Sequence, residues 1–305
     1  MQQAFLITAY KDEKQLFRLL DNVTSIGKAY VHIDTKSQEL DADAVRTKAS
    51  KRYEDKATIF SEYKIYWGGF DHILAIFYLM KQALKDGDNV YFHIISGQDY
   101  PVRSASEFEK YFSDNDHIYM SCTSEDDFPE EVKDRCRKYR IIGNENPNNI
   151  FVKALNRIGT KICSVLGKEP GVFNENLRPY KGMIWSSMPR TAAEYILDYV
   201  SEHPDFLKKL GHVRLAEEFI FQTILMNSRF AEHVVKDNLR YTDWENAVGG
   251  SPAVLDEKHY EKVVSSEAFF MRKVSSGISD SLVEIIEKNN EKSPKKDTRQ
   301  NAGEY

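Results

Sequence analysis

Cysteine is scarce in this chain of 305 residues, and the few cysteines do not have the spacing of metal ligands. There are three, Cys122, Cys136 and Cys163, with no CxxC pair among them. Structural zinc sites usually draw their ligands from such pairs, so a zinc site of this kind is disfavoured. A low, odd number of cysteines favours a reducing cytosol.

The start of the chain has no long hydrophobic run. The apolar stretch 4–9 ends just before Lys11, where charge begins. A signal peptide needs an apolar core of ~7–15 residues and a membrane-spanning helix needs ~20. We therefore expect a cytoplasmic protein that is neither secreted nor membrane-spanning.

Positive charge is also limited, because 42 Lys and Arg face 47 Asp and Glu, a formal net charge of −5. Nucleic-acid binding needs a concentrated basic face, so this role is disfavoured. The C-terminal end is basic, and we expect residues 288–305 to form a flexible tail that makes at most a weak peripheral contact with the inner face of a membrane. Its basic residues include Lys292, Lys295, Lys296 and Arg299.

Common nucleotide and hydrolase motifs are missing. There is no GxGxxG, GxxxxGK[ST], HExxH or GxSxG. Asp-x-Asp, which often holds a divalent ion on a nucleotide diphosphate, occurs in polar connections and is common by chance in a chain this acidic. We expect no metal site, and a metal-dependent enzyme using Asp114 or Asp116 is kept as an alternative. The three matches are Asp41/Asp43, Asp86/Asp88 and Asp114/Asp116.

Short apolar runs alternate with helical patterns over the first 120 residues. This alternation predicts an α/β fold with a central, mostly parallel sheet flanked by helices. We expect one domain, 1–287, with a nucleotide-binding half, 1–120, and an acceptor and catalytic half, 121–287, whose stretch 121–180 is polar and irregular. The predicted strands are 4–9, 29–33, 57–60, 90–95, 117–120, 182–188 and 269–271, and the predicted helices are 13–20, 70–84, 105–112, 192–200 and 215–226.

The carboxyl ends of parallel strands are where such sheets bind ligands. Ser96, Gly97 and Asp99 follow one predicted strand and are candidates for a donor pocket. Asp34 follows another, where it is a candidate ligand contact or a helix cap. Trp67, next to two glycines, offers a stacking face for a ligand, although turn geometry explains the glycines equally well.

Two charged pairs complete the candidates. Glu217 and Glu218 open a predicted helix, where they cap it or enter a cleft; adjacent residues lie ~100° apart, so they cannot both face one way. Arg272 and Lys273 close an apolar run. If buried, Arg binds a phosphate with forked hydrogen bonds and Lys acts as a point charge; the alternative is two surface charges. A basic cluster spans 133–140.

Together these segments resemble the core-2/I-branching β-1,6-N-acetylglucosaminyltransferase family, which also contains the peptide O-xylosyltransferases. The resemblance extends from residue 4 to residue 273 and rests on the order and spacing of its parts. They are VHIDTKS (31–37), YWGGF (66–70), ISGQDYPVRS (95–104), Gly182 with Trp185, EEFIFQT (217–223), RYTDW (240–244) and FMRK (270–273).

This resemblance implies a GT-A type fold with a Rossmann-like N-terminal half and an inverting transfer from a UDP-sugar, N-acetylglucosamine above all. It also implies no cofactor and no metal, because basic side chains replace the ion. The acceptor is expected to be an oligosaccharide or lipid-linked glycan, with a β-1,6 branch as product. By position, Glu218 matches the family's base, Asp34 its nucleoside contact, Arg272 and Lys273 its diphosphate contacts, and Trp244 an acceptor-side aromatic; Trp67 and Trp185 are further stacking candidates.

The chain departs from the family pattern in two places. Glu217 stands where the family usually has Asp, and Ile184 stands where xylosyltransferases have an aspartate, which argues against xylosyl transfer by that route. Few cysteines and no anchor suggest a bacterial, cytosolic relative. Alternatives are a transferase of UDP-xylose or UDP-glucose and a nucleotide-sugar-binding module without turnover.

Overall fold

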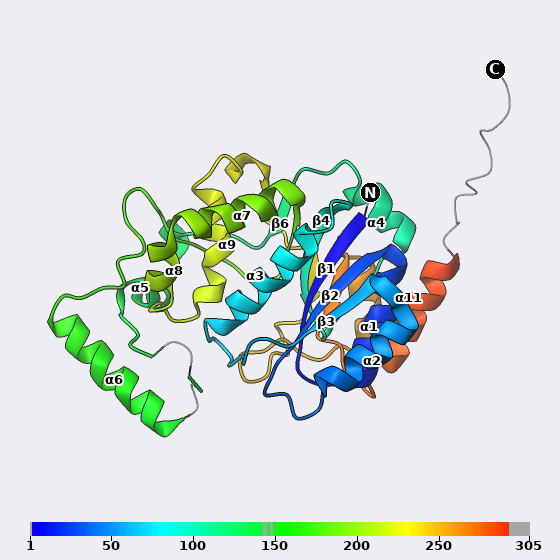
Figure 1. The fold of residues 1–305 in the computed structure, drawn as a ribbon, viewed down its shortest axis with the longest axis horizontal. Coiled ribbons are helices and arrows are strands. Elements are labelled where there is room, and N and C mark those ends of the chain that lie inside the picture. Colours follow the sequence, from blue (N-terminus) through cyan, green and yellow to red (C-terminus); the bar gives the residue numbers. More distant parts are fainter. Residues whose placement is uncertain (1, 143–144, 147–148, 293–305) are drawn as a thin grey trace, which may run out of the picture.

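The computed structural model of the protein describes residues 2–142, 145–146 and 149–292. Its centre is a seven-stranded sheet in the order β10-β6-β9-β4-β1-β2-β3 (Figure 1). β3, β2, β1 and β4 run parallel, as do β10 and β6, whereas β9 is antiparallel to both of its neighbours. The strands are β1 (Gln2–Ala9), β2 (Gly27–Ile33), β3 (Ala57–Phe60), β4 (Asn89–Ser96), β6 (Ile118–Met120), β9 (Ser186–Pro189) and β10 (Val234–Val235).

Helices cover both faces of this sheet, and β1 shows why. Ala4 and Leu6 pack into one core and Phe5 and Ile7 into the other, because successive strand residues point to opposite faces. The first core includes α3 (Asp71–Leu84), α7 (Arg190–Glu202) and α9 (Ile220–Met226), and the second includes α1 (Glu13–Ile26), α2 (Ala42–Tyr53), α4 (Ala105–Phe112) and α11 (Asp280–Lys292).

A second, three-stranded sheet packs on the second core. Its order is β11-β12-β5, with β11 (Arg240–Thr242), β12 (Phe270–Arg272) and β5 (Asp99–Pro101). β12 runs antiparallel to β5, and the register places Arg272 opposite Asp99. This pairing joins the last part of the chain to the loop that follows β4.

The remaining elements connect these layers. β7 (Thr123–Ser124) pairs with β8 (Tyr180–Lys181). The other helices are α5 (Glu130–Arg137), α6 (Ile150–Val165), α8 (Pro204–Leu210) and α10 (Tyr260–Val264), with single 3-10 turns η1 (Glu54–Lys56), η2 (Glu125–Asp127), η3 (Ala216–Glu218), η4 (Ala231–His233) and η5 (Glu257–His259). None of the helices within the described ranges combines the length and hydrophobicity needed to cross a bilayer.

The α/β class predicted from the sequence, with its mostly parallel sheet between helices, is confirmed. The strand 57–60 and the helix 105–112 have the predicted bounds. The prediction that 121–180 is irregular was wrong, because α5 and α6 lie within it.

Four smaller predictions also need correction. The polar connection expected around Asp41 is the start of α2, where the carboxylate accepts hydrogen bonds from the backbone N–H groups of residues 43 and 44. The predicted strand 182–188 is regular only from Ser186. The predicted helix 215–226 is interrupted, because η3 ends before Phe219 and α9 begins after it. α11 extends to Lys292, into the expected tail, whose other residues lie outside the described ranges.

Candidate functional site

Several strand ends converge at one edge of the central sheet. β1, β2 and β4 are parallel, so the residues at or just after their carboxyl ends, Lys11, Asp34 and Ser96–Asp99, lie along the same edge. β9 is antiparallel to β4, so Trp185, just before β9, is brought to that edge as well. The topology therefore gathers three of the segments singled out from the sequence, together with Lys11.

Arg272 and Asp99 form a buried ion pair at this edge. Arg272 Nη1 donates to Asp99 Oδ2 over 2.8 Å and to Ser96 Oγ over 3.0 Å. The same carboxylate oxygen accepts the backbone N–H and the hydroxyl of Ser96, each at 2.6 Å. Both hydrogen bonds from the Arg272 guanidinium to Ser96 and Asp99 use Nη1. Nε and Nη2 therefore donate to neither of these two residues.

A row of side chains leads from Arg272 to Glu217. The Arg272 guanidinium lies 4.3 Å from the centroid of the Trp185 ring, and this ring meets the His72 ring edge-on at 5.6 Å. His72 Nδ1 is 2.5 Å from Glu217 Oε2, and His72 Nε2 is 3.2 Å from Thr8 Oγ1. Glu217, which the sequence offered as a helix cap, is thus connected to the strand edge through His72.

Lys273 is half-buried, and within the described part of the chain its ammonium group has no hydrogen-bond or ion-pair partner. Burial lowers the pKa of this lysine, and the neighbouring charges of Arg272 and Lys11 lower the pKa further. Asp99 opposes these effects without cancelling them. The three cations therefore leave an excess of positive charge at the ends of β1 and β12, which favours an anion there.

Glu218 points to a different set of partners from Glu217. Its Oε2 accepts from Arg135 Nη1 at 2.9 Å and lies 3.1 Å from Lys181 Nζ. The side chain is about a quarter exposed, so solvent or a substrate can reach it. The predicted divergence of the two glutamates is confirmed, with each in a separate polar network.

Asp34 and Gly97 have clear structural roles. The Asp34 carboxylate is buried, accepts from the N–H groups of Lys36 and Ile65 at 3.0 and 3.1 Å, and pairs with Lys36 Nζ at 2.6 Å. It therefore ties the end of β2 to the loop that carries Trp67. A Cβ on Gly97 would lie 3.1 Å from the Ala9 Cβ, so glycine permits the tight packing of β4 against β1.

The two remaining tryptophans are surface residues. Trp67 is 68% exposed and Trp244 is 50% exposed, in contrast to Trp185, which is buried. Trp244 follows Asp243, whose side chain accepts from both the backbone and the side-chain amide of Asn246. These hydrogen bonds lower the pKa of Asp243 to about 2 and hold the turn that presents the Trp244 ring.

The structure also brings in residues that sequence reasoning did not single out individually. His72 had no signal beyond its place at the start of a predicted helix, and Lys181 had none. Arg135 belonged to the basic cluster 133–140, but its pairing with Glu218 is a long-range contact that the local pattern does not contain.

Two of the three Asp-x-Asp pairs, Asp86/Asp88 and Asp114/Asp116, lie away from this edge. Asp86 pairs with Lys28 at 2.8 Å, at the amino-terminal side of β4. Asp116 is exposed, precedes β6 and lies 3.2 Å from His233 Nδ1. Among the described residues, no three His, Cys, Asp or Glu side chains come together as a metal site would require.

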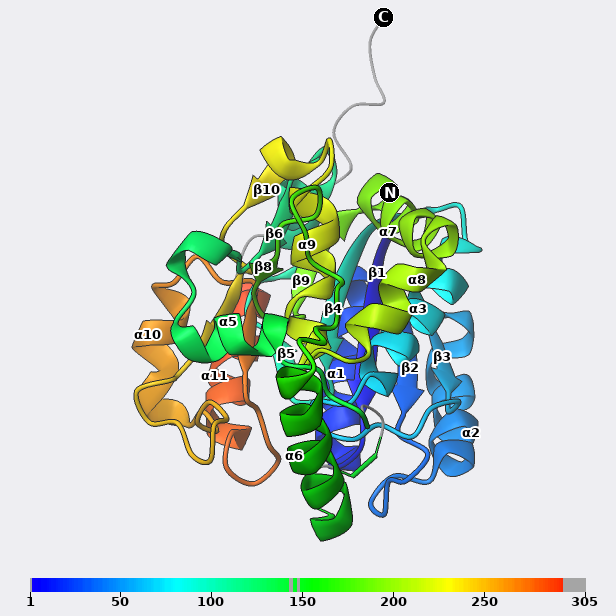
Figure 2. The ribbon, with the colours of Figure 1, turned by 90° about the vertical axis from the view of Figure 1, so that its left-hand side faces the viewer.

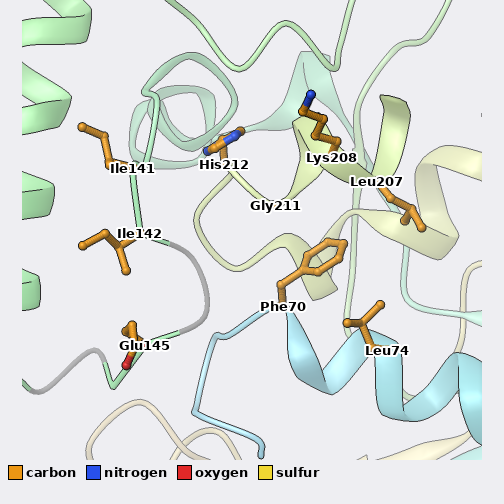
Figure 3. Close-up of a pocket in the computed structure, with 9 residues that line it drawn as sticks. All are labelled: Phe70, Leu74, Ile141, Ile142, Glu145, Leu207, Lys208, Gly211 and His212. Carbon is orange, nitrogen blue, oxygen red and sulfur yellow. The ribbon is translucent and has the colours of Figure 1, made fainter. Parts of the chain in front are cut away.

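A cavity of about 560 Å³ lies beside α3 (Figure 3). Phe70 and Leu74 face Ile141 and Ile142 across it, and its lining is mainly apolar. Phe70 lies two positions before His72, so the cavity borders the helix that supplies a site residue. The other lining residues are Glu145, Leu207, Lys208, Gly211 and His212.

A family model described as Core-2/I-Branching enzyme matches residues 3–269. The chain belongs to this family. The match includes Glu217, Glu218 and Trp185, and it ends just before Arg272 and Lys273. The family predicted from the order of the sequence segments is therefore confirmed.

Two relatives with similar sequences are named xylosyltransferases. Xylosyltransferase sqv-6 of Caenorhabditis briggsae is 21% identical over 91% of this chain, and Xylosyltransferase 2 of Rattus norvegicus is 22% identical over 85%. The chain spans only 35% and 30% of the length of these relatives. Among solved structures, the apo WbbM bifunctional glycosyltransferase matches 91% of this chain and 46% of its own, with 9% identity and a TM-score of 0.34.

Proposed function

We propose that the chain is an inverting glycosyltransferase that moves a sugar from a UDP-linked donor to a hydroxyl group of a glycan acceptor. One observation carries the proposal: Arg272, Lys273 and Lys11 form a partly buried positive site. Within the described structure, the ammonium group of Lys273 has no counter-ion. A diphosphate supplies that counter-charge. Membership of the Core-2/I-Branching enzyme family supports the same reaction class.

Arg272 and Lys273 are proposed to stabilise the leaving diphosphate. When the bond between the anomeric carbon and the phosphate oxygen breaks, its electron pair stays on that oxygen. Preorganised donors at such a developing charge are each worth ~3 kcal/mol. Because protein nitrogen supplies the charge, we propose that catalysis needs no metal ion.

Glu218 is the proposed base. Its carboxylate takes the proton of the acceptor hydroxyl, whose oxygen attacks the anomeric carbon from the face opposite the diphosphate. The ion pairs with Arg135 and Lys181 fix the position of the Glu218 carboxylate, and the two cations are proposed to donate to neighbouring hydroxyl groups of the acceptor. General-base assistance of this kind is worth ~10²–10⁴ in rate. The exposed rings of Trp67 and Trp244 are proposed stacking surfaces for acceptor sugars.

N-acetylglucosamine is the proposed donor sugar, with a β-1,6 branch as the product. Xylose is the second candidate, because the relatives that match most of this chain are named xylosyltransferases. Ile184, at the position where xylosyltransferases carry an aspartate, favours the first candidate.

A donor-hydrolysis screen tests the proposal. The chain is incubated with UDP-N-acetylglucosamine, UDP-xylose or UDP-glucose, with and without a galactosyl acceptor, and released UDP is measured in the presence and absence of EDTA. Acceptor-stimulated release that survives EDTA supports the proposal. Release abolished by EDTA would replace it with a metal-dependent transferase, and tight binding without release would make the chain a nucleotide-sugar-binding module.

A further inference from the structure

The outer side of α6 is not covered by any described element, yet it is unusually apolar. Large apolar side chains at 151, 155, 158, 162 and 165 are separated by alternating steps of four and three, so they form one stripe along the helix. All five are exposed, from 54% at Leu155 and Ile162 to 81% at Val165. Of the exposed large hydrophobic residues in the described structure, the helix and its two ends carry nearly half.

The outward direction of this stripe is set by specific contacts on the opposite side of α6. The Asn156 side chain accepts from the Ile142 N–H at 2.9 Å and donates to the Ile142 carbonyl at 3.1 Å. Thr160 Oγ1 donates to the Tyr139 carbonyl at 2.9 Å. A Cβ on Gly159 would lie 2.0 Å from Ile141 Cδ1, so the backbone packs closely against that residue. α6 is thereby docked on the segment 139–142, and its apolar stripe faces away from the rest of the protein.

The position of α6 leaves room for an extended surface. In Figure 1 the helix lies at one end of the molecule, apart from the sheet and its covering helices. In Figure 2, viewed from that end, it lies at the front. A flat surface can therefore approach the stripe without first meeting the layers around the central sheet.

The charge of α6 indicates which kind of partner surface the helix can bind. Lys153, Arg157 and Lys161 are exposed and four residues apart, so they form a row that turns around the helix. At ~100° per residue, Lys161 and Arg157 flank the apolar stripe, Lys153 lies further around the helix, and Lys168 follows the helix. Residues 149–168 contain no Asp or Glu, although the whole chain has a net charge of −5. A second copy of the chain would bring two rows of like charge together, which is unfavourable. An anionic lipid surface offers opposite charge to the basic row and an apolar interior to the stripe.

We propose that α6 is an interfacial helix that binds the protein to the surface of an anionic lipid bilayer. The apolar stripe enters the boundary between headgroups and acyl chains, and the basic row contacts the headgroups while its methylene stems remain along the apolar layer. This inference does not depend on the proposed transferase activity.

Vesicle co-sedimentation of the full chain tests the proposal. Vesicles of phosphatidylcholine alone are compared with vesicles that also contain phosphatidylglycerol. We expect binding to the anionic vesicles, weakened by salt, and a loss of about tenfold or more in Leu155→Glu/Ile162→Glu and in Lys153→Glu/Arg157→Glu/Lys161→Glu. Because these side chains are exposed, the variants are expected to keep the wild-type circular dichroism and thermal midpoint.

Matched controls separate the helix from other sources of binding. Val248→Glu changes an exposed apolar residue outside α6, and Lys51→Glu/Lys81→Glu/Lys258→Glu makes the same change of charge elsewhere; both are expected to bind like wild type. Lys295→Gln/Lys296→Gln/Arg299→Gln neutralises three basic residues of the C-terminal tail. This variant is expected to retain most of the binding to anionic vesicles. Absence of wild-type binding, full binding in both α6 variants, or loss in the tail variant alone would overturn the proposal. So would a dimer in light scattering that Leu155→Glu/Ile162→Glu converts to a monomer.

Discussion

The Arg272 guanidinium lies over the ring of Trp185, 4.3 Å from its centroid, although Arg272 ends β12 of the small sheet and Trp185 precedes β9 of the central sheet. Asp99 holds the other side of the same guanidinium, at 2.8 Å. A buried arginine held by a carboxylate and by a ring face has little freedom to turn. The cation that we assign to the diphosphate is therefore positioned before a donor binds.

Removal of the Trp185 ring is expected to weaken donor binding and the fold together. A cation–π contact of a buried guanidinium is worth up to ~2 kcal/mol, so we expect UDP affinity to fall by up to about 30-fold in Trp185→Ala. The loss of a buried aromatic side chain also costs ~3–5 kcal/mol of unfolding free energy. Trp185→Phe keeps a ring and is expected to lose less of both. Calorimetric UDP titration and urea denaturation measure the two effects; equal UDP affinity in wild type and Trp185→Ala contradicts the assignment.

The Asp99 carboxylate is expected to be required for stability. Asp99→Ala leaves Arg272 buried without its partner, a change that typically costs ~3–5 kcal/mol. Asp43→Ala provides the comparison, because Asp43 pairs with Arg46 on the surface and such pairs are worth ~0–1 kcal/mol. Urea denaturation of both variants checks this, and a similar small loss in each would show that the buried pair is not a structural requirement.

Lys273 is expected to contribute to donor binding at a cost to stability. Lys273→Met removes a half-buried charge, so we expect an unchanged or higher thermal midpoint together with a UDP affinity lowered by about tenfold or more. The surface variant Lys51→Met is expected to change neither quantity. A variant at 273 that binds UDP as tightly as wild type would remove the residue from the diphosphate site.

The pH dependence of Lys273 follows from the direction of its shift. Its pKa in the folded chain is below the usual lysine value of 10.5, whereas the unfolded chain keeps the usual value. Between these two pH values the unfolded state binds more protons, so the contribution of Lys273 to stability rises with pH. UDP affinity falls over the same range, because the ammonium loses its charge. Lys273→Arg is expected to shift this fall to higher pH, and identical pH profiles for UDP affinity in the two proteins would exclude Lys273 as the titrating group.

The two glutamates are expected to differ in function. Glu218→Gln keeps the shape of the side chain but removes the base, so donor binding is retained while acceptor-dependent turnover falls by ~10²–10⁴. Glu217→Gln loosens its contact with His72 and is expected to reduce turnover less, since no proton is assigned to it. Steady-state kinetics of both variants with a soluble acceptor measure this. A larger loss in Glu217→Gln would place the base on the His72 side of the site.

Much of the central fold follows from local pattern. The run 57–60 is bounded by polar residues and forms β3 with those limits, and the capping box of Ser104 and Glu107 starts α4 where the pattern predicts a helix. The rule that parallel strands gather their carboxyl ends also placed Ser96 and Asp99 at the candidate site. Periodicity and turn chemistry are properties of neighbouring residues, so they can be recognised without knowing any distant contact.

The region between residues 121 and 180 shows the opposite case. α6 has helical apolar spacing, but its outer stripe is exposed and its inner side is held by the amide of Asn156 and the hydroxyl of Thr160. The docking side buries only Val152, Gly159 and Cys163, whereas the large apolar side chains lie on the free side, which reverses the usual pattern of a surface helix. Composition alone therefore suggested an irregular segment.

The amino-acid order was sufficient to indicate the α/β sheet, the family and the charged pairs at 217–218 and 272–273, because these depend on residue type and short-range spacing. It was not sufficient to show which glutamate meets His72, which meets Arg135 and Lys181, or that Trp185 covers Arg272. Those pairings join residues far apart in the chain, and they exist only once strand order and helix packing have brought the segments together.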